Sequence, residues 1–289
     1  MKIIFICTGN TCRSPMAEGY LKAAALPDLE VQSRGLYADG SPVSENSALV
    51  MNELGIDISG HISRSLCRED LDSDLFICLS DSHRLALLSL GIDENKVLLL
   101  GDGIPDPFGG NLTVYRVCRD KIISAIDKLI YSGTFTPFSL CTPDSSLLAD
   151  IAELEKECFS EPWSQNALFE SMKAGTKFFT VCDKEERLLG YVGISTILDE
   201  GYITNVAVTR TARRKGVATL LMHKLFSLAR ELSLSFISLE VRASNSSAIS
   251  LYEKFGFVRE GLRKKYYREP VEDTIIMTKR FENHENFEY

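Results

Sequence analysis

Residues 2–18 read KIIFICTGNTCRSPMAE, and this stretch decides the fold of the first half of the chain. The apolar run predicts a buried strand over residues 2–6, and residues 14–26 have the apolar spacing of an amphipathic helix. The loop from Cys7 to Arg13 contains Gly9 and no acidic residue. A loop of this kind between a strand and a helix can point successive backbone N–H groups at one centre, which favours a bound anion.

The first 130 residues continue this alternation of strands and helices. Further strands are predicted at 74–79 and 96–100, and helices at 45–54, 81–90 and 114–130. Such alternation predicts a doubly wound parallel sheet with helices on both faces. On the last helix the apolar spacing predicts six inward residues, which are Val114, Val117, Cys118, Ile122, Ile126 and Leu129.

The rhythm changes after residue 134. The segment 131–144 is rich in Gly, Pro, Ser and Thr, so we expect a first domain over 1–134, a linker over 135–143, a second domain over 144–282 and a tail over 283–289. Helices at 145–158 and 165–173 are followed by strands at 177–183, 187–198 and 202–208. A helix at 216–232, a strand at 235–241, a helix at 246–255 and two final strands complete the pattern, which predicts a mixed-sheet α+β domain and an α/β protein overall.

Composition narrows the function classes. The 289 residues are 45% hydrophobic and 25% charged, as in globular proteins, and carry a net charge of −8, which disfavours nucleic acid as a partner. No apolar run approaches the roughly 20 residues of a membrane span, so we expect a cytoplasmic protein with reduced cysteines and no membrane contact. The cysteines lack Cys-x-x-Cys spacing and the four histidines are scattered, so no metal site is expected.

The loop from Cys7 to Arg13 has the groups needed for phosphoryl transfer. The field that binds an anion also favours the Cys7 thiolate, Arg13 can grip two phosphoryl oxygens, and Ser14 can bond the sulfur. We expect attack on phosphorus and a phosphocysteine intermediate, with Asp106 as the general acid. The same spacing recurs at Cys78 and Arg84, but that segment has no glycine and carries an aspartate.

These motifs resemble the low-molecular-weight protein tyrosine phosphatases over roughly residues 1–130. The resemblance rests on Cys7 to Ser14, the following Pro-Met-Ala-Glu, and the late Asp106-Pro-Phe loop. It implies that Cys7 is the nucleophile, that Arg13 binds the phosphoryl group and that Asp106 acts as acid and then base. The implied substrate loop comprises Thr8, Gly9, Asn10, Thr11, Cys12 and Ser14.

Two positions favour the protein-arginine-phosphatase branch of that family. Thr11 replaces the aliphatic residue usual in tyrosine-directed members, and Asp106-Pro-Phe-Gly-Gly resembles the acid loop of the branch. A phosphorylated protein is therefore the expected partner, with phosphoarginine preferred and phosphotyrosine as the alternative. Cys12 is either a small buried residue or a thiol that traps an oxidised Cys7 as a disulfide.

A second site is predicted between the strand ending at residue 208 and the helix that follows. A glycine, a small residue and several cations at the start of a helix can hold a diphosphate. The residues concerned are Arg213, Arg214, Lys215, Gly216, Val217 and Ala218.

The second half resembles the GCN5-related N-acetyltransferases over roughly residues 140–280, and more narrowly the RimI-type ribosomal-protein-alanine acetyltransferases. The family motifs are Arg-x-x-Gly-x-Ala at 213–218, Leu-Glu-Val-Arg-Ala-Ser-Asn at 239–245, and Leu-Tyr-Glu at 251–253 with Phe-Gly-Phe at 255–257. Glu-Pro-Trp-Ser at 161–164 and Tyr-Tyr at 266–267 support the narrower resemblance. The resemblance implies acetyl-CoA as cosubstrate, Glu240 as base and Tyr252 as acid. It also implies that Asn245 and the backbone of Val206 and Val208 bind acetyl-CoA, and that Trp163 and Tyr267 line the peptide groove.

The sequence thus predicts a bifunctional enzyme. One domain removes phosphate from protein arginine, and the other acetylates the N-terminal alanine of a small-subunit ribosomal protein. The alternatives are a phosphotyrosine phosphatase joined to an acetyltransferase of another amine, and a chain in which one domain is a catalytically silent binding module.

Overall fold

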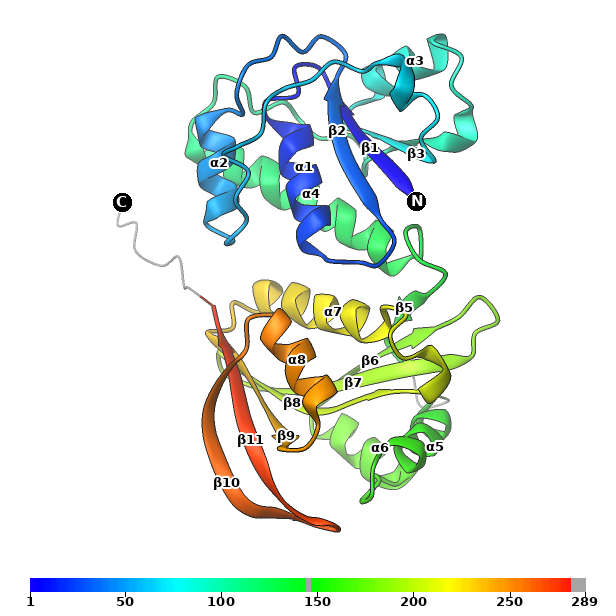
Figure 1. Cartoon of the computed structure of the whole chain (residues 1–289), viewed down its shortest axis with the longest axis vertical. Helices are drawn as coiled ribbons and strands as arrows, with labels where there is room; N and C mark the ends of the chain where they lie inside the picture. The colour runs from blue at the N-terminus through cyan, green and yellow to red at the C-terminus, as the bar shows by residue number, and fades with distance from the viewer. Residues whose placement is uncertain (144–146, 282–289) are drawn as a thin grey trace. The chain divides into compact units, whose positions relative to one another are not determined.

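The computed structural model describes residues 1–143 and 147–281. The chain divides into two compact units, Met1–Phe135 and Thr136–Tyr289, each with its own sheet (Figure 1). The predicted tail 283–289 and the first two residues of the helix predicted at 145–158 lie outside the described residues. None of the helices within the described ranges is both long and apolar enough to span a bilayer.

The first unit is built around a four-stranded parallel sheet. Its strands are ordered β2-β1-β3-β4, and helices connect them. In chain order the elements are β1 (Lys2–Cys7), α1 (Arg13–Ala23), β2 (Glu30–Gly35), α2 (Glu45–Asn52), β3 (Leu75–Cys78), α3 (Asp81–Ser89), β4 (Val97–Leu99) and α4 (Leu112–Tyr131), with short 3₁₀ turns at Arg68–Asp70 and Glu94–Lys96.

Both faces of this sheet are covered, as the continuous apolar runs of β1 and β3 require. Ile4 and Ile6 pack into a cluster with Leu87 of α3 on one face. Alternation along β1 places Ile3 and Phe5, which are also fully buried, on the opposite face. Helices α1 and α4 pack against each other (Figure 1). The prediction of a doubly wound parallel sheet is confirmed.

One sequence-based expectation for this unit is wrong, and one strand had no prediction. Val114 and Val117, predicted to point inward, are 45% and 53% exposed, because α4 turns Tyr115, Cys118 and Ile122 to the core in its first turns. The strand β2 was not predicted. Its sequence, EVQSRG, has a single large apolar residue, Val31, and its other two buried positions are filled by the small residues Ser33 and Gly35.

The second unit contains a seven-stranded mixed sheet ordered β10-β11-β9-β8-β7-β6-β5, in which only β8 and β9 run parallel. This confirms the predicted mixed-sheet α+β architecture. The elements are β5 (Ser139–Cys141), α5 (Leu148–Cys158), α6 (Gln165–Lys173), β6 (Lys177–Cys182), β7 (Leu188–Ile197), β8 (Glu200–Val208), a 3₁₀ turn (Arg210–Ala212), α7 (Val217–Glu231), β9 (Phe236–Arg242), α8 (Ser246–Lys254), β10 (Val258–Arg268) and β11 (Val271–Arg280). Strand β5 lies inside the segment predicted as a linker.

Helices cover both faces of this sheet as well. On β6, Phe178 belongs to the core cluster that α5 and α6 form, whereas the adjacent Phe179 lies beneath Lys224 of α7. Neighbouring strand residues point to opposite faces, so α7 lies across the sheet from α5 and α6. Phe226 of α7 packs on Phe255 and Phe257, which follow α8, and this places α8 on the same face as α7.

Candidate active sites in the two units

The first candidate site lies where β1 ends. The chain leaves the sheet at Cys7, and the left-handed backbone of Asn10 (φ 56°) turns it back into α1. This turn brings the Asn10 backbone N–H to 3.2 Å from Cys7 Sγ, and Ser14 Oγ lies 2.9 Å from the same sulfur. Two hydrogen-bonding groups therefore converge on the predicted nucleophile, an arrangement suited to a thiolate.

The buried Asn10 amide holds the loop in shape. Its Nδ2 donates to Ser14 Oγ (2.9 Å) and to Ser33 Oγ (2.8 Å) on β2. Its Oδ1 accepts from the Arg64 backbone N–H (2.9 Å) and lies 3.1 Å from His61 Nε2. Because every position of the amide is used, the loop is fixed to three separate segments of the unit.

Arg13 joins the predicted nucleophile loop to the predicted acid loop. Its side chain is nearly buried (6% exposed), and Nη1 donates to the Ile104 carbonyl at 3.1 Å. Its Nη2 donates to Asp106 Oδ2 at 2.5 Å, although the two residues are 93 positions apart. The Asp106 carboxylate is half exposed, so it can reach a group that enters from solvent.

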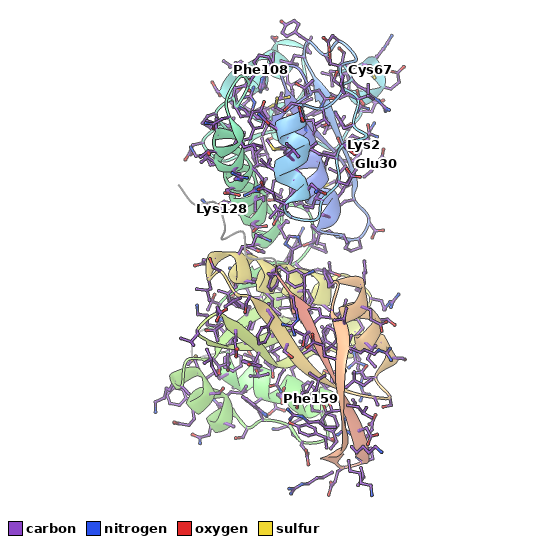
Figure 2. The ribbon with its side chains drawn as sticks, turned by 90° about the vertical axis from the view of Figure 1, so that its left-hand side faces the viewer. Lys2, Glu30, Cys67, Phe108, Lys128 and Phe159 are labelled. Atoms are coloured by element: carbon purple, nitrogen blue, oxygen red, sulfur yellow. The ribbon has the colours of Figure 1, made fainter. Side chains whose placement is uncertain are left out.

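The aromatic residue of the acid loop, Phe108, is exposed to solvent. Phe108 is 79% exposed. Figure 2 shows it far from Lys2 and Glu30, which mark the amino ends of β1 and β2. Phe108 therefore lies at the edge of the sheet where the loops following the parallel strands gather, which is where α/β proteins place their ligands.

Cys12 and Thr11 lie at the end of the loop. The Cys12 sulfur is buried, 3.4 Å from the Tyr115 hydroxyl and 3.6 Å from Thr11 Oγ1. Burial, together with the contact to Cys12, raises the pKa of Tyr115 to about 12, so the phenol keeps its proton at neutral pH. Helix α4 thus contacts the loop through Tyr115.

His83 is a site residue that the sequence did not reveal. It lies on α3, inside the segment whose Cys78 and Arg84 share the spacing of the loop, and its Nε2 lies 2.9 Å from Thr8 Oγ1. Burial, with the nearby Arg13 charge, lowers the pKa of His83 to about 4. A lone histidine in a helix carries no sequence signal of such a contact.

The second candidate site lies where β8 and β9 separate. Their parallel ladder runs only from Glu200↔Phe236 to Tyr202↔Ser238, and in the described chain no pairing continues it. The Thr209 N–H bonds the Leu189 carbonyl of β7, so by antiparallel alternation Val206 and Val208 turn their backbone groups away from β7. Backbone groups that pair with no described strand therefore line the opening. One of them, the Val208 carbonyl, accepts from Arg213 Nε at 3.1 Å and from Cys158 Sγ at 3.6 Å.

The predicted diphosphate turn joins this opening to α7. Both Arg214 (φ 63°) and Gly216 (φ 93°) adopt the left-handed conformation, and Gly216 caps the fifteen-residue helix. Val217 is buried, and its side chain packs toward Gly190 of β7 and not toward a ligand. Free N–H groups at a long helix start, with cations around them, fit the diphosphate of acetyl-CoA.

Glu240 and Tyr252 lie on neighbouring elements, β9 and α8. Glu240 forms an ion pair with Arg263, whose Nη1 lies 2.8 Å from Glu240 Oε1. Burial, with a smaller effect from Tyr267, raises the pKa of Tyr252, so its hydroxyl retains a proton to give. Asn245 caps α8, its Oδ1 accepting from the Ala248 N–H at 3.1 Å.

Arg242 joins Tyr267 to the segment that precedes Trp163. The Arg242 guanidinium stacks 4.0 Å from the Tyr267 ring and donates to Ser160 Oγ at 2.9 Å, three residues before Trp163. The Trp163 side chain itself is half-buried against the cluster of α5 and α6. Within the described ranges, no cluster of three or more His, Cys, Asp or Glu side chains could hold a metal.

Comparison with known families assigns a family to each unit. The model of the low molecular weight phosphotyrosine protein phosphatases matches residues 2–134, and that of the acetyltransferase (GNAT) family matches residues 148–257. The chain belongs to both families, with a low-molecular-weight phosphatase domain followed by a GNAT acetyltransferase domain.

Three relatives illustrate the match. A low molecular weight protein-tyrosine-phosphatase PtpB of Staphylococcus haemolyticus is 37% identical, over 45% of this chain and 97% of its own length. A protein-arginine-phosphatase of Geobacillus stearothermophilus is also 37% identical, over 44% and 93%. A putative [ribosomal protein bS18]-alanine N-acetyltransferase of Bacillus subtilis is 34% identical, over 44% and 85%.

Proposed function

We propose that residues 1–134 form a protein phosphatase that works through a phosphocysteine and prefers phosphoarginine. The observation that carries this proposal is the bond between Arg13 and Asp106, which brings the acid loop to the loop around Cys7. Neither a binding loop alone nor an acid alone could complete the reaction.

The reaction follows from the positions of three groups. The Cys7 thiolate attacks phosphorus in line while Arg13 grips the phosphoryl oxygens, and Asp106 gives its proton to the departing nitrogen or oxygen. The bond to the leaving group breaks as the S–P bond forms. A water molecule then attacks the phosphocysteine, Asp106 accepts its proton, and phosphate leaves.

The preference for arginine rests on Thr11 and the acid loop. A hydroxyl at position 11 can help to orient a guanidinium-linked phosphoryl group, and it narrows the pocket for a phenol ring. The arginine and tyrosine phosphatases described above are equally similar to this chain, so overall identity favours neither substrate.

Phosphate release from matched phosphoarginine and phosphotyrosine peptides tests this preference. We expect faster release from phosphoarginine, and we expect Thr11→Ile to shift the ratio toward phosphotyrosine, whereas Thr134→Ile, remote from the loop, leaves it unchanged. Faster turnover of phosphotyrosine by the wild type would refute the arginine assignment.

We propose that residues 144–282 acetylate the N-terminal alanine of a small-subunit ribosomal protein. The opening between β8 and β9, continuous with the Gly216 turn, is the observation that carries this assignment. The bound acetyl-CoA supplies an acetyl thioester. The turn 213–218, Asn245 and the backbone of Val206 and Val208 are the groups that would hold it.

The chain itself supplies the proton chemistry. Glu240 takes a proton, through water, from the incoming amine, and Tyr252 gives its hydroxyl proton to the departing thiolate. A terminal α-amine, with a pKa near 8, loses its proton far more readily than lysine, near 10.4. A single carboxylate is therefore sufficient for a terminal alanine.

Acetylation of peptides with a free N-terminal alanine and of matched lysine peptides with a blocked N-terminus tests the substrate. We expect only the former to react, with strong loss in Glu240→Gln and Tyr252→Phe. Preferential lysine acetylation would support the alternative amine. A wild-type protein without turnover at one site would identify that domain as a silent binding module.

A further inference from the structure

The loops that follow two adjacent strands of the phosphatase sheet, β1 and β3, meet at one side chain, His83. Strands β1 and β3 pair in parallel, with Ile6 opposite Cys78, so their following loops lie side by side. His83, in the first turn of α3, bridges these loops: its Nε2 lies 2.9 Å from Thr8 Oγ1, and its Nδ1 lies 2.8 Å from Ser80 Oγ. The ring is 3% exposed, so it cannot contact a bound substrate directly.

The surroundings of His83 dictate its protonation state. Burial and the Arg13 charge oppose a second proton on the ring, and the Asp106 charge only partly offsets them, so the pKa of His83 is lowered to about 4. The ring is therefore neutral at physiological pH, with one N–H donor and one lone pair. Each of the two hydroxyls, Thr8 Oγ1 and Ser80 Oγ, meets one of these, and neither bond needs a charged group.

We propose that His83 is a positioning residue of the phosphatase site, which holds Thr8, and with it the first peptide of the phosphate loop, against the loop that follows β3. This inference rests on the proposed phosphatase function. Thr8 directly follows the nucleophile, so a shift of its backbone moves an N–H group away from the phosphoryl oxygens. A neutral imidazole performs this task without placing a second positive charge beside Arg13.

Inorganic phosphate, as a competitive inhibitor of aryl phosphate hydrolysis, probes the loop directly. We expect His83→Leu to raise the inhibition constant of phosphate and to lower kcat/KM by about tenfold, the effect of one lost buried hydrogen bond. His83→Gln, which keeps a donor and an acceptor, should restore most of both. A purely structural role would lower the thermal unfolding temperature and leave the inhibition constant of the folded fraction unchanged, and that result would overturn the proposal.

A double-mutant cycle tests the route through Thr8. If His83 acts through the Thr8 hydroxyl, Thr8→Val should have a similar effect, and the double variant should be no worse than the more damaged single variant. Fully additive losses would show that the two residues act separately and would contradict the proposal.

A measurement on the wild-type protein does not depend on whether these variants fold. In NMR spectra of the imidazole nitrogens, the His83 ring should stay neutral from pH 8 to pH 5, whereas an ordinary histidine titrates near 6.5. Titration of His83 within that range would overturn the proposal. Absence of aryl phosphate hydrolysis by the wild type would instead count against the phosphatase function itself, because the NMR result does not require turnover.

Discussion

At the scale of single residues, the phosphatase site depends on an amide whose hydrogen-bonding groups are all engaged. Asn10 has two donors and an acceptor oxygen, and it uses them on Ser14, Ser33, Arg64 and His61. A carboxylate in its place would lack the two donors, and an aliphatic side chain would lack both the donors and the acceptor. The residue also takes the left-handed backbone that asparagine tolerates better than most residues.

We therefore predict that Asn10→Ala lowers the free energy of unfolding of the first unit by about 2–3 kcal/mol, because buried partners lose their bonds. Phosphatase activity should fall together with stability. Urea unfolding and phosphate release measure the two effects, and Asn52→Ala, an exposed position at the end of α2, is the control. Equal stability of the two variants would refute this view of Asn10.

A buried carboxylate plays the corresponding part in the acetyltransferase unit. Glu155 is fully buried; its Oε2 accepts from the Trp163 N–H at 2.7 Å, and its Oε1 accepts from the Tyr191 hydroxyl and from Asn205 Nδ2. Burial raises its pKa, the donated bonds offsetting part of the effect. The loop that carries Trp163 is thus hydrogen-bonded to Glu155, a carboxyl group whose ionisation is opposed by burial.

The sign of the pH effect follows from that raised pKa. Below the ordinary value of 4.5 both the folded and the unfolded chain hold the proton, whereas above the raised value the folded chain must bury a charge. Relative to Glu155→Gln, the wild type should therefore gain stability as the pH falls from 7 to 5. Urea unfolding at both pH values measures this, with the exposed Glu153→Gln as control; a difference independent of pH would contradict it.

At the scale of elements, the candidate acetyltransferase site lies where β8 and β9 separate and their backbone groups no longer pair with each other. Two strands that begin as a parallel ladder and then separate expose backbone groups that an uninterrupted sheet would hide. The turn at Gly216 then leads from this opening into α7. Glycine is suited to that turn because its backbone is left-handed (φ 93°).

Gly216→Ala should accordingly raise the KM for acetyl-CoA by about tenfold, because straightening a turn strained by about 1–2 kcal/mol moves the N–H groups of the helix start. Gly175→Ala is the matched control, since Gly175 is also left-handed (φ 102°) and borders open space. It should cost similar stability and leave the KM unchanged. Equal KM values for both variants would show that the turn does not contact the cosubstrate.

The elements that could be predicted from the sequence are those whose own residues show a clear apolar pattern or turn motif. The apolar run of β1 and the glycine-containing loop after it were sufficient to predict a strand, a turn and a helix. Strand β2 was missed because small residues beneath α1 and the loop replace large apolar ones. Val114 and Val117 were predicted to be buried because periodicity identifies the apolar face of a helix. It does not show which turns of that face extend beyond the core.

The candidate sites divide in the same way. Loop residues adjacent in sequence were identified together, and Asp106 was identified from its own motif. His83, Glu155 and the Arg263 contact of Glu240 could not be predicted, because each is defined by partners from other parts of the fold.

At the scale of the whole molecule, the two sheets share no strand among the described residues, and the residues of each candidate site belong to a single unit. We therefore predict that Cys7→Ser abolishes phosphate release and leaves acetyl transfer intact, whereas Tyr252→Phe does the reverse. Both activities should be measured on the same preparations. A variant that loses both activities while its unfolding transitions match those of the wild type would disprove this independence.

The bond between Arg13 and Asp106 has a consequence for turnover. In the resting chain the guanidinium already donates to Asp106 Oδ2, so inorganic phosphate formed at the end of a cycle competes for Arg13 with a side chain of the protein itself. When phosphate leaves, Asp106 can occupy the free guanidinium nitrogen again, which favours release of the product and weak product inhibition.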